Sequence, residues 1–166
     1  ICQINKLYRA DIFKNLQYPS YLLCEADSLI YEELKVARKI MYLNAPLYGY
    51  RFERSVLAMS ENREQYFIDS IKVRCNVVDQ AYADGAANLI NKADSNDWIE
   101  FMVSRMIDNM IELYPQIQHT FEVKDALKAA KAKYRRYRRS IINHFHYDMF
   151  FLFPLLVAKP SRKNNR

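Results

Sequence analysis

The residues with the clearest chemical potential lie between Lys128 and Arg139. This stretch contains seven cations, no acids and two tyrosines. On a helix, apolar residues of the segment line one face and cations line another, so the helix can pack into a bundle and still present its charge. The residues predicted to contact a phosphate backbone are Lys124, Lys128, Lys131, Arg135, Arg136, Tyr137, Arg138 and Arg139.

The charge of the chain is strongly segregated. Residues 1–121 contain 13 Lys and Arg against 16 Asp and Glu, a balance of −3, and residues 122–166 contain 12 against 3, a balance of +9. Regularly spaced guanidinium groups match a phosphate backbone, and Tyr137 could stack on a base at the rim. We therefore expect a nucleic-acid-binding protein with a regulatory or accessory role. Because no helix-turn-helix signature is present, contact with the backbone is favoured, and DNA and RNA both stay open.

Two other interpretations of the basic face remain open. It could bind an acidic protein partner, as a helical adaptor would. It could also be a solvated face that acids of another helix balance, for which the candidates are Glu25, Asp27, Glu32 and Glu33. An anionic lipid surface is less favoured, because the apolar residues of the same helix indicate core packing.

Within this region, Arg139 and His144 form an Arg-x4-His pattern with Ser140 and Asn143 between them. The pattern resembles the signature of HEPN-type ribonucleases, which are small all-helical domains that usually dimerise. The resemblance covers these six residues, and the Asn or Asp that often follows the family's arginine is missing here. It implies metal-independent RNA cleavage, with Arg139 stabilising phosphate charge and His144 acting as acid or base.

The sequence predicts no metal and no cofactor. His144 and His146 would lie about 200° apart on a helix, and His144 with Asp148 would supply only two ligands. No nucleotide, dinucleotide, serine-hydrolase or zincin motif is present. The methionines Met102, Met106 and Met110 follow helical spacing, which favours core over a ligand pocket.

Composition indicates an all-α domain in a reducing compartment. Two glycines cannot supply the turns of a β-rich protein of 166 residues. Three scattered cysteines suit the cytoplasm, and Cys24 and Cys75 are expected to be buried and unreactive. The longest uncharged apolar run, 149–158, has about half the length of a membrane span, so no membrane span is expected.

Hydrophobic periodicity predicts an antiparallel bundle of four to five helices in one domain, 1–158, followed by a basic tail, 159–166. The helices are expected from Ser20 through Met41, from Ser60 to Gly85, from Asp94 to Pro115, and from Thr120 in one long helix to Phe153. The expected inward residues are Leu23, Ala26, Ile30, Leu34, Ala37 and Met41; Phe67, Ile71, Cys75, Val78 and Tyr82; Ile99, Met102, Val103, Met106, Met110 and Leu113; and Leu127, Ala130, Tyr134, Ile141, Phe145 and Met149. The thirteen tyrosines favour a homo-oligomer, because an apolar ring with a polar tip suits an interface.

Overall fold

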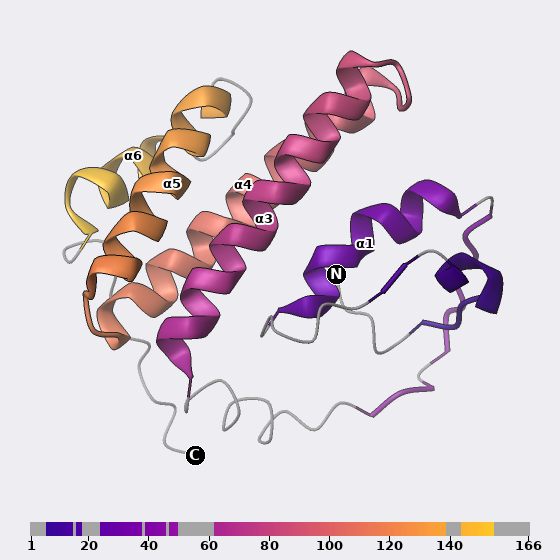
Figure 1. Cartoon of the computed structure of the whole chain (residues 1–166), viewed down its shortest axis with the longest axis horizontal. Helices are drawn as coiled ribbons and strands as arrows, with labels where there is room; N and C mark the ends of the chain where they lie inside the picture. The colour runs from indigo at the N-terminus through magenta and orange to yellow at the C-terminus, as the bar shows by residue number, and fades with distance from the viewer. Residues whose placement is uncertain are drawn as a thin grey trace.

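The computed structural model describes residues 6–14, 16–17, 24–37, 39–45, 47–49, 62–138 and 144–154. Their helical elements, in chain order, are η2 (Ala10–Lys14), α1 (Glu25–Val36), α3 (Arg63–Ala86), α4 (Lys92–Leu113), η3 (Tyr114–Gln116), α5 (Phe121–Tyr137) and α6 (His144–Leu152) (Figure 1). No strand occurs in these ranges, and the helices pack on one another. The predicted all-α bundle is confirmed.

The hairpin of α3 and α4 forms the centre of the bundle (Figure 1). On α4, the predicted inward residues are all buried: Ile99, Met102, Val103, Met106, Met110 and Leu113. The prediction that the methionines belong to the core is therefore confirmed. Because the apolar residues of this 22-residue helix recur with the helical period of 3.6, they gather on one face, and that face packs against α3.

The turn between α3 and α4 differs from the expected glycine stop. Gly85 lies inside the last turn of α3, and Asn88 is the residue with positive φ, at 56°. A Cβ on Gly85 would stand 2.5 Å from the Oγ of Ser95 on α4, and that Oγ donates to the carbonyl of Ala81 at 2.7 Å. Gly85 is thus required for close contact of the two helices rather than for a left-handed cap.

Contacts between side chains fix the direction of the other helices. Asp79 and Tyr82 of α3 meet Lys133 and Tyr137 of α5 in the same order, so α3 and α5 run in the same direction. On the other side of α3, Asp27 meets Arg74, and Tyr31 and Lys35 meet Asp84, so α1 also runs parallel to α3. The successive helices α3, α4 and α5 alternate in direction, as in an antiparallel bundle.

The single long helix predicted after Thr120 is wrong. Thr120 does cap α5, since its Oγ1 accepts from the backbone N–H of Val123, but α5 ends at Tyr137 and α6 starts at His144. The ring of Phe151 stacks on Tyr134 at 5.3 Å, so α6 folds back beside α5. The physical reason is burial: a continuous helix would carry Tyr147 and Phe150 beyond the bundle, whereas folding back leaves both almost fully buried.

This reversal also changes which residues of the last segment face the core. Phe145, predicted to point inward, is 75% exposed, and Met149 is half-buried. The hydroxyl of the buried Tyr147 donates to Asp108 of α4 at 3.0 Å. Ile141 lies outside the described residues.

Two other predicted stripes are shorter than expected. The helix α1 ends at Val36, and Met41 is 79% exposed beyond it. On α3, Phe67, Ile71 and Val78 are buried, but Tyr82 is exposed. Cys24 is buried and Cys75 half-buried, and burial raises the pKa of the Cys75 thiol to about 11, which opposes reactivity. The predicted starts at Ser20 and Ser60 lie outside the described residues.

Within the described ranges, no helix combines the length and the apolar character that a bilayer crossing requires.

Candidate nucleic-acid interface

The helix α5 carries most of the residues predicted to bind a phosphate backbone. It holds six cations against the acids Glu122 and Asp125. Its buried side consists of Val123, Ala126, Ala130 and Tyr134, which pack against α3 and α4. Because the core occupies that side, the cations must lie on the two flanks and on the outward crest.

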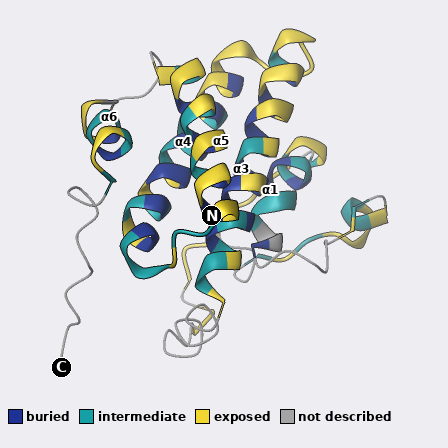
Figure 2. Cartoon of the chain, turned by 60° about the vertical axis from the view of Figure 1, so that its left-hand side comes forward, coloured by how far each residue is buried: buried dark blue, intermediate teal, exposed yellow. Residues whose placement is uncertain are grey.

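One flank of α5 presents a row of cations to solvent, and we call Lys124, Lys128, Lys131 and Arg135 the open flank. Their spacing of four, three and four residues places them in one line about 16 Å long. Lys124, Lys128 and Arg135 are exposed, and Figure 2 shows exposed residues along α5. None of these three forms an ion pair with a carboxylate of the described residues. Lys131 is half-buried and donates one N–H to the carbonyl of Phe151 at 3.2 Å, where α6 lies against α5.

Two of the other cations are neutralised. Arg138 donates from Nε to both carboxylate oxygens of Asp148 on α6, at 3.0 and 2.9 Å, and also pairs through Nη2. The hydrogen bond to Asp148 raises the pKa of Arg138 further above its usual range, so it stays charged but is paired. On the opposite flank, Lys133 pairs with Asp79 of α3. Of the eight residues predicted to contact the backbone, Arg138 is therefore paired with a carboxylate, whereas Lys133 was not among the eight.

At the C-terminal end of α5, a cation lies over two aromatic rings. The guanidinium carbon of Arg136 is 4.8 Å from the ring centroid of Tyr82 and 5.5 Å from that of Tyr137. The two rings are 6.1 Å apart. Tyr137, predicted at the rim, is half-buried, and Tyr82 of α3 is the exposed ring of the cluster.

Two of the acids suggested as balancing charges, Asp27 and Glu32, pair with residues outside the basic segment. Asp27 accepts from Arg74 at 2.6 Å, and Glu32 lies 3.7 Å from Lys35, both at α1. Glu33 is buried, and the side chain of Glu25 lies outside the described part of the chain. Among the described residues, the carboxylates that pair with cations of the basic segment are Asp79 and Asp148, so Asp27 and Glu32 do not supply the neutralisation.

The residues of the ribonuclease-like pattern are only partly in view. Arg139, Ser140 and Asn143 lie outside the described residues, and of His144 only the backbone, at the start of α6, is described. The catalytic assignment of Arg139 and His144 therefore stays a prediction. His146 is exposed on the first turn of α6.

Metal ligation finds no support in the ranges that the structure covers, where no three His, Cys, Asp or Glu side chains converge. Asp148, the possible partner of His144, accepts hydrogen bonds from Arg138 and from the hydroxyl of Tyr134, the latter at 2.9 Å. The buried Tyr134 has its pKa raised to about 12, first by burial and then by Asp148.

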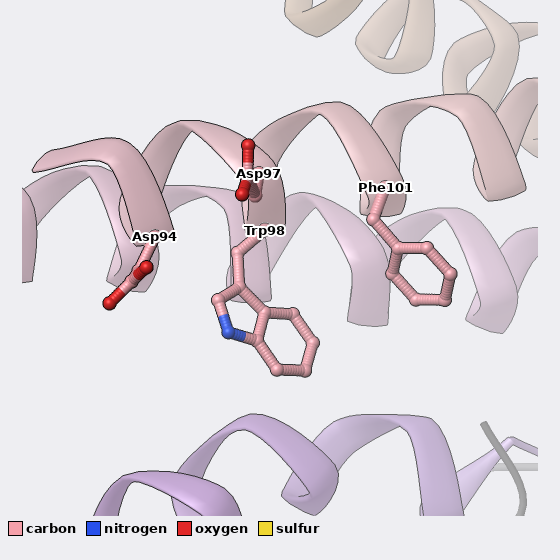
Figure 3. Close-up of a pocket in the computed structure, with 4 residues that line it drawn as sticks. All are labelled: Asp94, Asp97, Trp98 and Phe101. Atoms are coloured by element: carbon pink, nitrogen blue, oxygen red, sulfur yellow. The ribbon is translucent and has the colours of Figure 1, made fainter. Parts of the chain in front are cut away.

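A shallow pocket lies on α4 on the side that faces α1 (Figure 3). It encloses about 290 Å³ and is lined by Asp94, Asp97, Trp98 and Phe101. Trp98 packs edge-on against Tyr31 and Phe101, and Asp97 points to the opposite side of α4 from both α4 rings. The carboxylates of Asp94 and Asp97 do not converge on the two rings of α4, so the pocket lacks the convergent polar groups of a catalytic site.

The sequence did not predict three residues of the basic surface around α5: Tyr82, Asp79 and Asp148. Tyr82 was placed on the buried stripe of α3, because 3.6-residue spacing alone cannot show where a neighbouring helix ends. Asp79 and Asp148 each pair with a cation that only tertiary packing brings near. The clustered arginines and interleaved tyrosines were the signal that did locate the region.

Searches of protein-family models, curated protein sequences and solved structures returned no match to this chain.

Proposed function

We propose that this protein is a nucleic-acid-binding helical protein with a regulatory or accessory role, which contacts the phosphate backbone through the open flank of α5. The observation that supports it best is the line of Lys124, Lys128 and Arg135, exposed and without a described carboxylate partner. Three exposed cations in one row, next to a fourth that keeps free N–H groups, form a surface suited to a polyanion.

The neighbours of α5 favour backbone contact over insertion into a groove. The helix α6 lies against part of the open flank, where Lys131 contacts Phe151, and α3 lies against the opposite flank, where Asp79 pairs with Lys133. A recognition helix about 10–12 Å wide needs both of its flanks free to enter the major groove. Because α3 lies along one flank and α6 covers the open flank at Lys131, α5 cannot reach base edges in a duplex, but the exposed Lys124, Lys128 and Arg135 remain available to phosphates.

The affinity for nucleic acid should fall steeply as the salt concentration rises. Four cations that each neutralise one phosphate give a slope of log K against log salt of about −2.8 for a single strand and about −3.6 for a duplex. Between about 50 and 200 mM salt, affinity should then fall by about 50- to 150-fold. Fluorescence anisotropy with labelled single-stranded and duplex probes, RNA and DNA, measures this slope directly.

The test uses two variants with the same change in net charge. The first, Lys124→Ala/Lys128→Ala/Arg135→Ala, removes the exposed part of the open flank and should reduce the magnitude of the salt slope by about two to three. The second, Lys72→Ala/Lys92→Ala/Arg105→Ala, removes three exposed cations of α3 and α4 and should leave the slope nearly unchanged. Equal effects of the two variants would mean that only net charge matters, and a salt-insensitive Kd would remove the proposal.

An acidic protein partner is the other outcome of the same experiment. If nucleic-acid affinity is absent while the open-flank variant loses binding to polyglutamate, the surface recognises acidic protein instead. The expected cytoplasmic location and homo-oligomeric state belong to this proposal too, and light scattering at micromolar concentration tests the second.

A further inference from the structure

The aromatic cluster of Tyr82, Arg136 and Tyr137 lies beside the open flank and is not part of it. Tyr82 is 47% exposed although it stands on the central helix of the bundle. Its ring is supported from α5, because the Arg136 guanidinium lies over it and the Tyr137 ring lies beside it. An exposed tyrosine held by a cation and a second ring is a platform already oriented for another planar group.

We propose that this cluster stacks an unpaired base, so that the ligand of the open flank is a single-stranded nucleic acid. The inference rests on the proposed function and names the class of its substrate. Every base has a π-face that a tyrosine or a guanidinium plane can stack on, but only an unpaired base can turn that face to a protein surface. A duplex would offer phosphates to the open flank and nothing to Tyr82.

The positions of the two features support their joint use. Arg135 of the open flank and Arg136 of the cluster are consecutive, and they lie about 100° apart around α5. The exposed Ala132, one turn before Arg135 and Arg136, lies between them around α5, so no large side chain separates the two sides there. A strand whose phosphates follow the open flank can therefore cross the end of α5 and place a base at Tyr82.

The charges around the cluster also favour a polyanion. Among the described residues, the carboxylate that pairs beside the cluster is Asp79, which lies one turn before Tyr82 on α3 and is neutralised by Lys133.

The first test keeps the protein unchanged and alters the ligand. Anisotropy compares a normal strand of about 15 nucleotides, a strand of equal length with abasic sites, and the matching duplex, at one salt concentration. We expect the normal strand to bind at least about fivefold more tightly than either of the others, since removal of a stacked aromatic typically costs that much or more. Equal binding of the normal and abasic strands overturns the inference.

The second test changes the ring. Tyr82→Ala should weaken single-strand binding by at least about fivefold and leave duplex binding within about twofold, whereas Tyr82→Phe, which keeps the ring, should behave as wild type. Phe121→Ala removes an exposed ring at the other end of α5 and should change neither affinity. A smaller loss in Tyr82→Ala, or an equal loss in Tyr82→Phe, contradicts the stacking role.

The two proposals fail separately. If the open-flank variant loses binding while Tyr82→Ala keeps the preference of wild type, contact with the backbone stands and stacking is wrong. If the open-flank variant binds nucleic acid like wild type, both the proposed function and the stacking inference fail. A 5-bromouracil strand, cross-linked and mapped by mass spectrometry, should attach to the peptide that contains Tyr82 or to the one that contains Tyr137, and attachment elsewhere overturns the inference.

Discussion

The Nη2 of Arg74 donates to the carboxylate of Asp27 at 2.6 Å, and this pair joins α3 to α1. The Arg74 side chain is almost completely buried, and its Nη1 also donates to the carbonyl of Ser70 at 3.4 Å. When the side-chain amide of Asn109 on α4 is turned so that its oxygen faces Arg74, that oxygen accepts from Nη1 at 3.1 Å and from Nη2 at 3.2 Å. A cation in the core is thus held by three elements of the fold.

Removing the carboxylate should weaken the bundle. Asp27→Ala leaves a buried guanidinium without its charged partner, and we expect a loss of about 2–3 kcal/mol in the free energy of unfolding. Urea denaturation followed by circular dichroism measures it. Asp11→Ala, which breaks the exposed pair with Arg9, is the control and should cost less than about 0.5 kcal/mol.

Releasing Arg138 should strengthen nucleic-acid binding. Asp148→Asn removes the charge that pairs with Arg138, so one more cation beside the open flank becomes available. We expect affinity for a single strand to rise by about two- to fivefold and the salt slope to steepen by about one. Asp97→Asn makes the same change in net charge on α4 and should have little effect. Equal gains in both variants would show a general charge effect instead.

The stability of the α1–α3 contact should depend on pH through Asp84. Burial acts to raise the pKa of this carboxyl, but the hydrogen bonds from Lys35 and Tyr31, each 2.7 Å long, outweigh burial and lower it. Because the pKa in the folded protein is lowered, the stabilisation is present above the ordinary value of about 4 and is lost as pH falls through the folded value.

Asp84→Asn tests this dependence. We expect a loss of about 1.5–3 kcal/mol at neutral pH and a weaker decline of stability between about pH 5 and 2 than in wild type. Trp98, the one tryptophan of the chain, packs on Tyr31 at 5.3 Å and reports the unfolding by fluorescence. An unchanged acid dependence in the variant would assign the pH effect to other carboxylates.

Close packing at Gly85 predicts a large effect of one methyl group. In Gly85→Ala, the new Cβ would stand 2.7 Å from the Cβ of Ser95, so α3 and α4 must separate. We expect a loss of about 1–3 kcal/mol and a lower Tm in calorimetry. Gly49→Ala has no heavy atom within 4 Å of its new Cβ and should be neutral or slightly stabilising. Similar Tm values for the two variants would contradict the tight contact.

The sequence predicted best those features that depend on one helix alone. The inward stripe of α4 and the cap at Thr120 follow from spacing and from a single hydroxyl, and both are present. The end of α5 at Tyr137 could not be found this way, since no proline or glycine occurs between Tyr137 and His144. There, burial of Tyr147 and Phe150 against the bundle prevails over helix propensity.

The basic surface shows the same division. Composition and spacing located it on the segment after Thr120, but the pairs of Lys133 with Asp79 and of Arg138 with Asp148 join different helices. Which cations remain available depends on those pairs. Likewise, the exposure of Tyr82 depends on where α5 ends beside α3, which periodicity in either helix does not encode.

The position of α3 and α4 as neighbours in the chain has a kinetic consequence. The two longest helices described, α3 and α4, are separated only by residues 87–91. The largest apolar contact of the bundle therefore closes with a very short loop. Contacts of low sequence separation carry a small entropic barrier and form early. The hairpin is thus suited to act as the nucleus on which α5 assembles, whereas α1 must first close the long connection that precedes Arg63 before its ion pair with Arg74 can form.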